Sequence, residues 1–418
     1  MDDLKGPLKP SLQIPGDWEA YYTEILGDVI RVSTTSAHFV YLNTVDCATD
    51  LLEKRASATA NRPRKFMIDD IMGWSEGVGL HVHERHKKIR RVMASALHPM
   101  AARSHAPQHL SSAISFLNLI ARSPDKYREH ATNAVGAFTI QMTSDRALWV
   151  NDIPILKYLP SRLPGAGFKK LEQRGRQLRD QYVNQPFDQV VEMMRRNKLE
   201  HSSYTSKLLE AKGGVNASPE DVDLVKWAAA AMYLAGSSTT IRVIFVFFMM
   251  MALYPDLAQR AQAEIDSVVG RGRISDFSDR GSLPYVEALL QVVMRVPPPA
   301  PLGYPKTRLS TQTLAESNYS PYRFMPDRYL KPTPDPDPRK YIFGFGRRVC
   351  PGLHVANDSA WIMCAGVLSL FDIRAGEDLN QRVKEIGGRE SPQLYKLFDG
   401  YGASSPLPFE YKITIRDG

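Results

Sequence analysis

One uninterrupted helical pattern constrains the fold of this chain more than any other feature. Residues 218–221, SPED, form a capping box with proline at the first helical position. The pattern then runs unbroken to Leu253, and Pro255 restarts the chain. The result is a helix of about 35 residues, or roughly 50 Å at 1.5 Å per residue. A helix this long and this apolar must cross the middle of a large protein or a membrane.

The membrane alternative has some support, because residues 227–253 are long enough to span a bilayer. However, the polar run GSSTT at residues 236–240 interrupts the apolar stretch at its centre, and Arg242 follows at once. A central arginine disfavours insertion by about 2.5–3.5 kcal/mol. We therefore favour a buried core helix over a transmembrane span.

A second constraint is the stretch FGFGRRVCPG at residues 343–352, just before a helix predicted over 353–370. It places Cys350 near a helix N-terminus, where the dipole and unpaired N–H groups favour thiolate. The neighbouring Arg347 and Arg348 add positive charge, and the glycines let the backbone approach something large and flat. One thiolate, without a second Cys or His at metal-ligand spacing, suits haem better than four-coordinate zinc. The alternative is a buried cysteine at a glycine-rich helix start.

This loop resembles that of the cytochrome P-450 family, the haem-thiolate monooxygenases, whose pattern is F-x-x-G-x-R-x-C-x-G. Every fixed position is filled, by Phe343, Gly346, Arg348, Cys350 and Gly352. The resemblance implies haem b as cofactor, with Cys350 as the iron ligand and the other four residues around the cofactor. It extends over most of the chain, and is closest to fungal microsomal members, including those resembling O-methylsterigmatocystin oxidoreductase.

The polar break in the long helix also resembles a family element. Residues 235–240, AGSSTT, are similar to the oxygen-activation motif A-G-x-(acid)-T-T. By that resemblance Gly236 leaves room for O2 beside the iron, and the Thr239 hydroxyl relays protons to bound oxygen. Ser238 takes the place of the acid and relays protons less readily. The alternative is a polar patch that only packs, with hydroxyls bonding back to carbonyls one turn earlier.

Three further stretches are similar to parts of the family. Residues 283–295 look like its K helix, and residues 324–329 look like its P-E-R-F element, with Arg328 as the arginine. Arg90 falls where the family's C helix supplies a propionate-binding arginine. His86 stands in place of the usual tryptophan of that helix, and a histidine can still donate the bond.

The chain also departs from the family pattern. The K helix of the family carries E-x-x-R, and alignment on Arg295 puts Val292 at the glutamate position. Glu287 is eight residues from that arginine, about 12 Å along a helix. We expect Arg295 to lie in the interior without its usual partner. Segments that build the substrate pocket look too short between residues 304 and 321, and others between residues 143 and 151.

These features predict a mostly α fold with a small β-rich N-terminal part. We expect a single haem-thiolate domain over residues 1–418, β-rich over about 17–60 and mainly helical over 61–418. Within it the patterns indicate a helix over 18–26, a hairpin of strands 29–33 and 38–42, a helix over 44–54 and a final strand over 411–415.

The resemblance implies insertion of one oxygen atom from O2 into an apolar small molecule, such as a secondary metabolite or xenobiotic. An NADPH-cytochrome reductase would supply the electrons. The alternative is a haem-deficient, non-catalytic relative or a chain that lacks pocket segments through an incorrect gene model. Val292 and the short segments favour that alternative.

Composition narrows the class and compartment. The chain has 418 residues with 43% hydrophobic content, which is ample for a large core. Its net charge of +8 is spread over short basic runs without interleaved aromatics, so an acidic redox partner or an anionic membrane surface is favoured over nucleic acid. For any one basic cluster, an ordinary solvated surface is the favoured interpretation. The three cysteines, Cys47, Cys350 and Cys364, form no disulfide framework. Resemblance points to the endoplasmic reticulum surface, but residues 1–5 show no apolar anchor and leave the cytoplasm as the other expectation.

Overall fold

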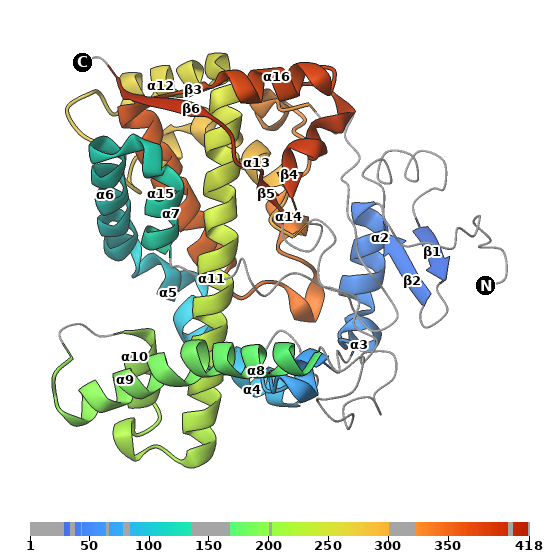
Figure 1. The fold of residues 1–418 in the computed structure, drawn as a ribbon, viewed down its shortest axis with the longest axis vertical. Helices are drawn as coiled ribbons and strands as arrows, with labels where there is room; N and C mark the ends of the chain where they lie inside the picture. The colour runs from blue at the N-terminus through green and yellow to red at the C-terminus, as the bar shows by residue number, and fades with distance from the viewer. Residues whose placement is uncertain are drawn as a thin grey trace. The chain divides into compact units, whose positions relative to one another are not determined.

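The computed structural model describes residues 29–33, 38–42, 44–63, 67–77, 84–135, 168–199, 203–300, 323–399 and 404–416 (Figure 1). The chain divides into two compact units. The first comprises residues 1–60, 103–138 and 237–418, and the second comprises residues 61–102 and 139–236. Helices predominate within the described residues, and strands occur there only in short pairs, which confirms the mostly α fold.

The first unit is mainly helical in its described part. Its helices are α2 (Val45–Thr49), the π-helical η1 (Asp50–Lys54), α3 (Ala56–Thr59), α6 (Ala106–Arg122), η3 (Pro124–Lys126), α7 (Tyr127–Val135), α12 (Pro255–Val268), η8 (Arg280–Ser282), α13 (Pro284–Arg295), η9 (Pro326–Tyr329), α14 (Arg339–Ile342), η10 (Gly346–Arg348), α15 (Leu353–Leu370), α16 (Glu377–Glu385) and η11 (Pro392–Leu397). The short helices η9, α14 and η10 lead into α15, the helix that follows Cys350.

The N-terminal part of this unit contains the predicted hairpin. Strands β1 (Val29–Ser33) and β2 (His38–Leu42) pair antiparallel, with Val29 opposite Leu42. The helix predicted over 44–54 has the expected extent, but only its first half is α-helical. Thr44 caps α2 by accepting a hydrogen bond from the Cys47 amide at 3.3 Å, and the chain then widens into the π-helix η1.

Helix α11 (Pro219–Leu253) has the bounds predicted from the sequence and is 35 residues long (Figure 1). Residues 241–253 are all buried, and α6, α7, α12, α13 and α15 contribute to the same hydrophobic core. Among the described residues it is the one helix long and apolar enough to cross a membrane, yet 71% of its apolar window is buried inside the protein. That stretch therefore packs as a core helix.

Helices α6 and α15 approach each other closely in this core. A methyl carbon added at Gly366 of α15 would lie 2.8 Å from Leu117 Cδ1 of α6, so a larger residue there would require the Leu117 side chain to move. Trp361 of α15 is fully buried nearby in the same cluster. The long α15 is therefore held rigidly by its neighbours.

Short strand pairs complete the first unit. Strand β3 (Phe371–Ala375) pairs antiparallel with β6 (Tyr411–Ile415), which is the strand predicted at the C-terminus. Strand β4 (Phe398–Asp399) pairs with β5 (Ser405–Pro406). The β3–β6 pair follows directly from α15, since β3 begins at the residue after Leu370.

The second unit is helical in its described part and includes the first half of α11. Its other helices are η2 (Met67–Ile71), α4 (Glu84–Leu97), α8 (Phe168–Arg179), η6 (Asp180–Asn184), α9 (Gln185–Arg195), α10 (Tyr204–Glu210) and η7 (Gly214–Asn216), and α5 (Pro99–Arg103) joins the two units along the chain. Arg85 of α4 binds Asp223 of α11 at 2.6 Å, and Trp74 meets Trp227 edge to face. The helix predicted over 18–26 and the short segments at 143–151 and 304–321 lie outside the described residues.

Candidate functional site

The loop that carries Cys350 is closed by main-chain hydrogen bonds. The Cys350 amide donates to the Phe343 carbonyl at 2.8 Å, and the Val349 amide donates to the Gly346 carbonyl at 3.1 Å. Helix α15 then begins at Leu353, as predicted. The loop therefore presents a half-buried thiol at the N-terminal end of a long core helix, where the thiolate form is favoured.

Gly352 and Gly346 have different parts in this loop. Gly352 is the N-cap of α15, and a carbon added there would lie 3.9 Å from Cys350 Sγ, an ordinary contact. Gly346 has φ +57°, and a carbon added there would lie 2.2 Å from the Leu52 carbonyl oxygen. Gly346 thus allows the loop to pack against η1, a role that the sequence pattern alone did not show.

The arginine and aromatic residues of the loop fix it to the N-terminal helices. Arg348 Nε donates to the Ala60 carbonyl at 2.8 Å. Phe345 is buried against Leu42 and Leu52 in a small core cluster, and Phe343 supplies the carbonyl that closes the loop. The Arg348 guanidinium therefore ties the loop to the main chain just after α3.

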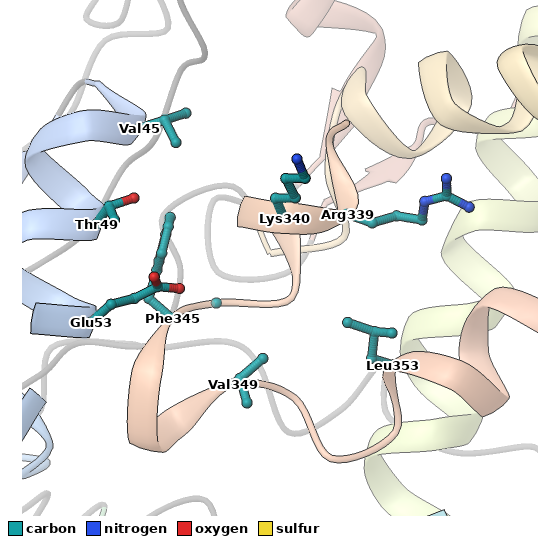
Figure 2. Close-up of a pocket in the computed structure, with 9 residues that line it drawn as sticks. Val45, Thr49, Glu53, Arg339, Lys340, Phe345, Val349 and Leu353 are labelled. Carbon is teal, nitrogen blue, oxygen red and sulfur yellow. The ribbon is translucent and has the colours of Figure 1, made fainter. Parts of the chain in front are cut away.

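A cavity of about 450 Å³ lies beside the loop (Figure 2). One wall comes from the helical stretch α2–η1 and the other from α14, the loop and the start of α15, with lining residues Val45, Thr49, Glu53, Arg339, Lys340, Gly344, Phe345, Val349 and Leu353. Cys350 does not line this cavity.

The polar break of α11 leaves one part of this helix uncovered, although the helix itself is continuous. Ala235 and Gly236 are exposed, and a carbon added at Gly236 would meet nothing within 4 Å. Ser238 and Thr239 follow and are half-buried. The polar break therefore offers open space beside two hydroxyl-bearing residues on an otherwise apolar helix.

The expected burial of Arg295 on α13, without a carboxylate at position 292, is confirmed in part. Val292 is completely buried, and Arg295 Nη1 is buried without a hydrogen-bond partner. Burial, and then the nearby charge of Arg328, lower the pKa of Arg295. Arg328 itself is fully buried and has its own carboxylate, since its Nη1 donates to Asp335 Oδ2 at 3.0 Å.

Two carboxylates in this region were not identified from the sequence. Asp335 accepts a hydrogen bond from Arg328, and Glu287 of α13 binds both Arg280 and Arg339. Nothing in the local sequence pattern marks these partners, because Glu287 and Arg339 are 52 residues apart.

The two predicted propionate ligands lie on α4 in the second unit. His86 and Arg90 are four residues apart and therefore share one face of that helix. His86 is buried and Arg90 is half-buried. Phe343, Gly346, Arg348, Cys350 and Gly352 lie together in the first unit, whereas Gly236 ends the second unit and Ser238 and Thr239 belong to the first.

These residues fit a haem-thiolate protein. A half-exposed thiol stands at the start of α15, and in the part of the chain that the structure describes no three His, Cys, Asp or Glu side chains gather as a metal site. The fold and site thus define the class of haem-thiolate oxygenases.

Sequence comparison gives the family. The profile of the family described as Cytochrome P450 matches residues 122–320 and 319–395, so the chain belongs to the cytochrome P450 family. It is 31% identical to Cytochrome P450 monooxygenase 208 of Postia placenta, with 96% of this chain and 86% of the relative covered. It is 28% identical to Tryptamine 4-monooxygenase of Psilocybe cyanescens, with 93% and 86% covered. The family carries haem b, and these relatives are monooxygenases.

The comparisons also bear on the short segments. The alignment with the Postia placenta relative extends over 462 positions, more than the 418 residues of this chain, so that relative has segments that this chain lacks. The family match breaks at residues 319–320, inside the stretch where we expect pocket strands to be missing.

Proposed function

We propose that this protein inserts one oxygen atom from O2 into an apolar small molecule, a secondary metabolite or xenobiotic. Electrons come from an NADPH-cytochrome reductase, and the protein works at the surface of the endoplasmic reticulum. The observation that carries the proposal is the Cys350 loop, which holds one half-buried thiol at the N-terminus of α15.

In this proposal the residues of the Cys350 loop and of α4 bind the haem. Cys350 would hold the iron of the haem through its thiolate. Arg348 of the loop holds a haem propionate, together with Arg90 and His86 of α4. Haem b, when bound, supplies the activation of O2 and the acceptance of electrons.

In this proposal the polar break of α11 provides room for O2 and hydroxyl groups that carry protons. Gly236 leaves room for O2, because no atom lies within 4 Å of the position of its missing methyl carbon. The Thr239 hydroxyl would act as the proton donor in this space, and the Ser238 hydroxyl next to it would be a weaker relay than a carboxylate.

The test is the difference spectrum of the reduced, carbon-monoxide-bound protein, followed by turnover with NADPH and a reductase. A thiolate-type spectrum and product formation support the proposal. Tryptamine is a reasonable first substrate to assay, because one relative is named for acting on it. A thiolate spectrum with no reductase-dependent oxidation of any apolar probe would contradict the proposed reaction.

A haem-deficient binding protein is the second candidate. The Nη1 atom of Arg295 favours it, since a buried guanidinium nitrogen without a hydrogen-bond partner weakens the structure behind the loop. Absence of haem from protein purified with added haem precursor would select this candidate over the oxygenase.

A further inference from the structure

The carboxylate of Glu287 is shared by two arginines from different elements. Arg280 donates from Nε to Glu287 Oε2 at 3.0 Å and from Nη2 to Oε1 at 3.2 Å. Arg339 donates from Nη1 to Oε1 of the same carboxylate. Glu287 therefore links η8, α13 and α14 through one side chain that is 25% exposed.

The two arginines connect Glu287 to the helices on either side of the Cys350 loop. Arg339 lies in α14, which ends one residue before Phe343, as Figure 2 shows for the helix and the loop that follows it. At the other end, Arg280 Nη1 donates to Asp358 Oδ1 of α15 at 2.9 Å. Because Cys350 lies between α14 and α15, Glu287 bridges the elements on both sides of the thiol.

Arg339 has a second carboxylate partner that orients it. Asp337 Oδ1 accepts from the Arg339 amide and from Arg339 Nε, both at 2.9 Å, and Asp337 Oδ2 accepts from Nη2 at 2.6 Å. Burial alone would lower the pKa of Arg339, but its bonds to Asp337 and the charge of Glu287 outweigh it and raise the pKa. The guanidinium is thus pre-organised between two carboxylates.

We propose that Glu287 is a positioning residue for the thiolate ligand, holding the Cys350 loop from both ends through Arg339 and through Arg280 and Asp358. The proposal rests on the proposed haem-thiolate function. Because position 292 is valine, the carboxylate that connects α13 to the helices flanking the loop is that of Glu287, five residues earlier. Loss of this carboxylate leaves two cationic side chains without their shared acceptor and frees the loop to open locally.

The test compares Glu287→Gln with Asp266→Asn in the purified full-length protein. Asp266 is a matched control, because it is 23% exposed and also binds two arginines, Arg271 and Arg416, but it connects α12 to the segment after β6. Hydrogen exchange of the loop amides at 344–350 should become about tenfold faster in Glu287→Gln, equivalent to about 1.4 kcal/mol in local opening. It should stay at the parent rate in Asp266→Asn.

A second readout is the share of thiolate-type signal in the reduced carbon-monoxide spectrum. This share should fall in Glu287→Gln and not in Asp266→Asn. Glu287 and Arg339 act through one contact in this proposal. The loss of loop protection in the double variant Glu287→Gln/Arg339→Gln should therefore be smaller than the sum of the losses in Glu287→Gln and Arg339→Gln. Equal loop exchange in Glu287→Gln, Asp266→Asn and the parent would overturn the proposal.

The exchange measurement does not depend on haem. If the parent protein gives no thiolate spectrum, the proposed function fails, while faster loop exchange in Glu287→Gln still supports the hold of Glu287 on the loop. If the parent gives the spectrum but Glu287→Gln keeps both its spectrum and its loop protection, the function stands and the positioning role is wrong.

Discussion

Val292 is completely buried on α13 one helical turn before Arg295, whose Nη1 atom is buried without a hydrogen-bond partner. Its neighbour Arg328 has taken Asp335 as partner, and Lys331 shares that carboxylate at 2.6 Å. The cluster therefore holds more positive than negative charge. This imbalance lowers the stability of the region behind the Cys350 loop.

We predict that Val292→Glu stabilises the protein and improves haem retention. A carboxylate at position 292 lies within reach of Arg295 on the next turn and can accept from its unpartnered nitrogen. Breaking a buried pair typically costs about 3–5 kcal/mol, and we expect the restored pair to return less than that. The measurements are the thermal midpoint and the haem stoichiometry.

Val293→Glu is the matched control for this prediction. Val293 is also buried, but it points to a different face of α13, so a carboxylate there should destabilise the protein. Val292→Gln separates charge from hydrogen bonding and should recover only part of the gain. A midpoint for Val292→Glu at or below that of the parent would mean that the chain has adapted its packing to valine.

Gly346→Ala should disrupt the Cys350 loop far more than Gly352→Ala. The first change forces a non-glycine residue to φ +57° and drives its methyl carbon to 2.2 Å from the Leu52 carbonyl oxygen. The backbone conformation alone costs about 1–3 kcal/mol. At Gly352 an added methyl carbon would lie 3.9 Å from Cys350 Sγ, an ordinary contact. Thermal midpoints and thiolate spectra of the two variants test this, and similar losses in both would contradict it.

The elements that could be predicted from the sequence are those with local punctuation. A capping box and a following proline set the ends of α11, and the glycine-rich loop set the start of α15. The π-helical turn η1 could not be predicted, because its sequence carries the same helical periodicity as α2. The Glu287–Arg339 pair depends on tertiary proximity that no local pattern records.

Asp279 should contribute to acid sensitivity. Two hydrogen bonds from Arg273, each of 2.6 Å, lower the pKa of Asp279. Its stabilising effect is therefore complete above the ordinary aspartate pKa of 3.8 and is lost as the pH falls through the lower pKa of the folded state. Asp279→Asn should lower the thermal midpoint near neutral pH, and the gap from the parent should close in acid. A gap that stays constant with pH would assign the effect to packing.

Thr239→Ala should uncouple electron use from product formation. The Thr239 hydroxyl is half-buried in the polar break of α11, next to the open space at Gly236. Without a positioned proton donor, electrons should be lost to hydrogen peroxide, and product per NADPH should fall severalfold. Thr240→Ala is the control, since Thr240 is buried and packs in the helix. If both variants keep the parent ratio, Thr239 only packs.

Cys350→Ala should abolish the thiolate-type carbon-monoxide spectrum, whereas Cys47→Ala and Cys364→Ala should keep it. Cys350 is half-buried in the loop before α15, where the helix dipole favours the charged sulfur. Cys364 lies deep in the core, and burial raises its pKa, so it stays a neutral thiol. Cys47 lies within the short helix α2 and packs against the small cluster that also holds Phe345 of the loop. Retention of the thiolate spectrum in Cys350→Ala would show that another sulfur binds the iron, and the proposed site would then be wrong.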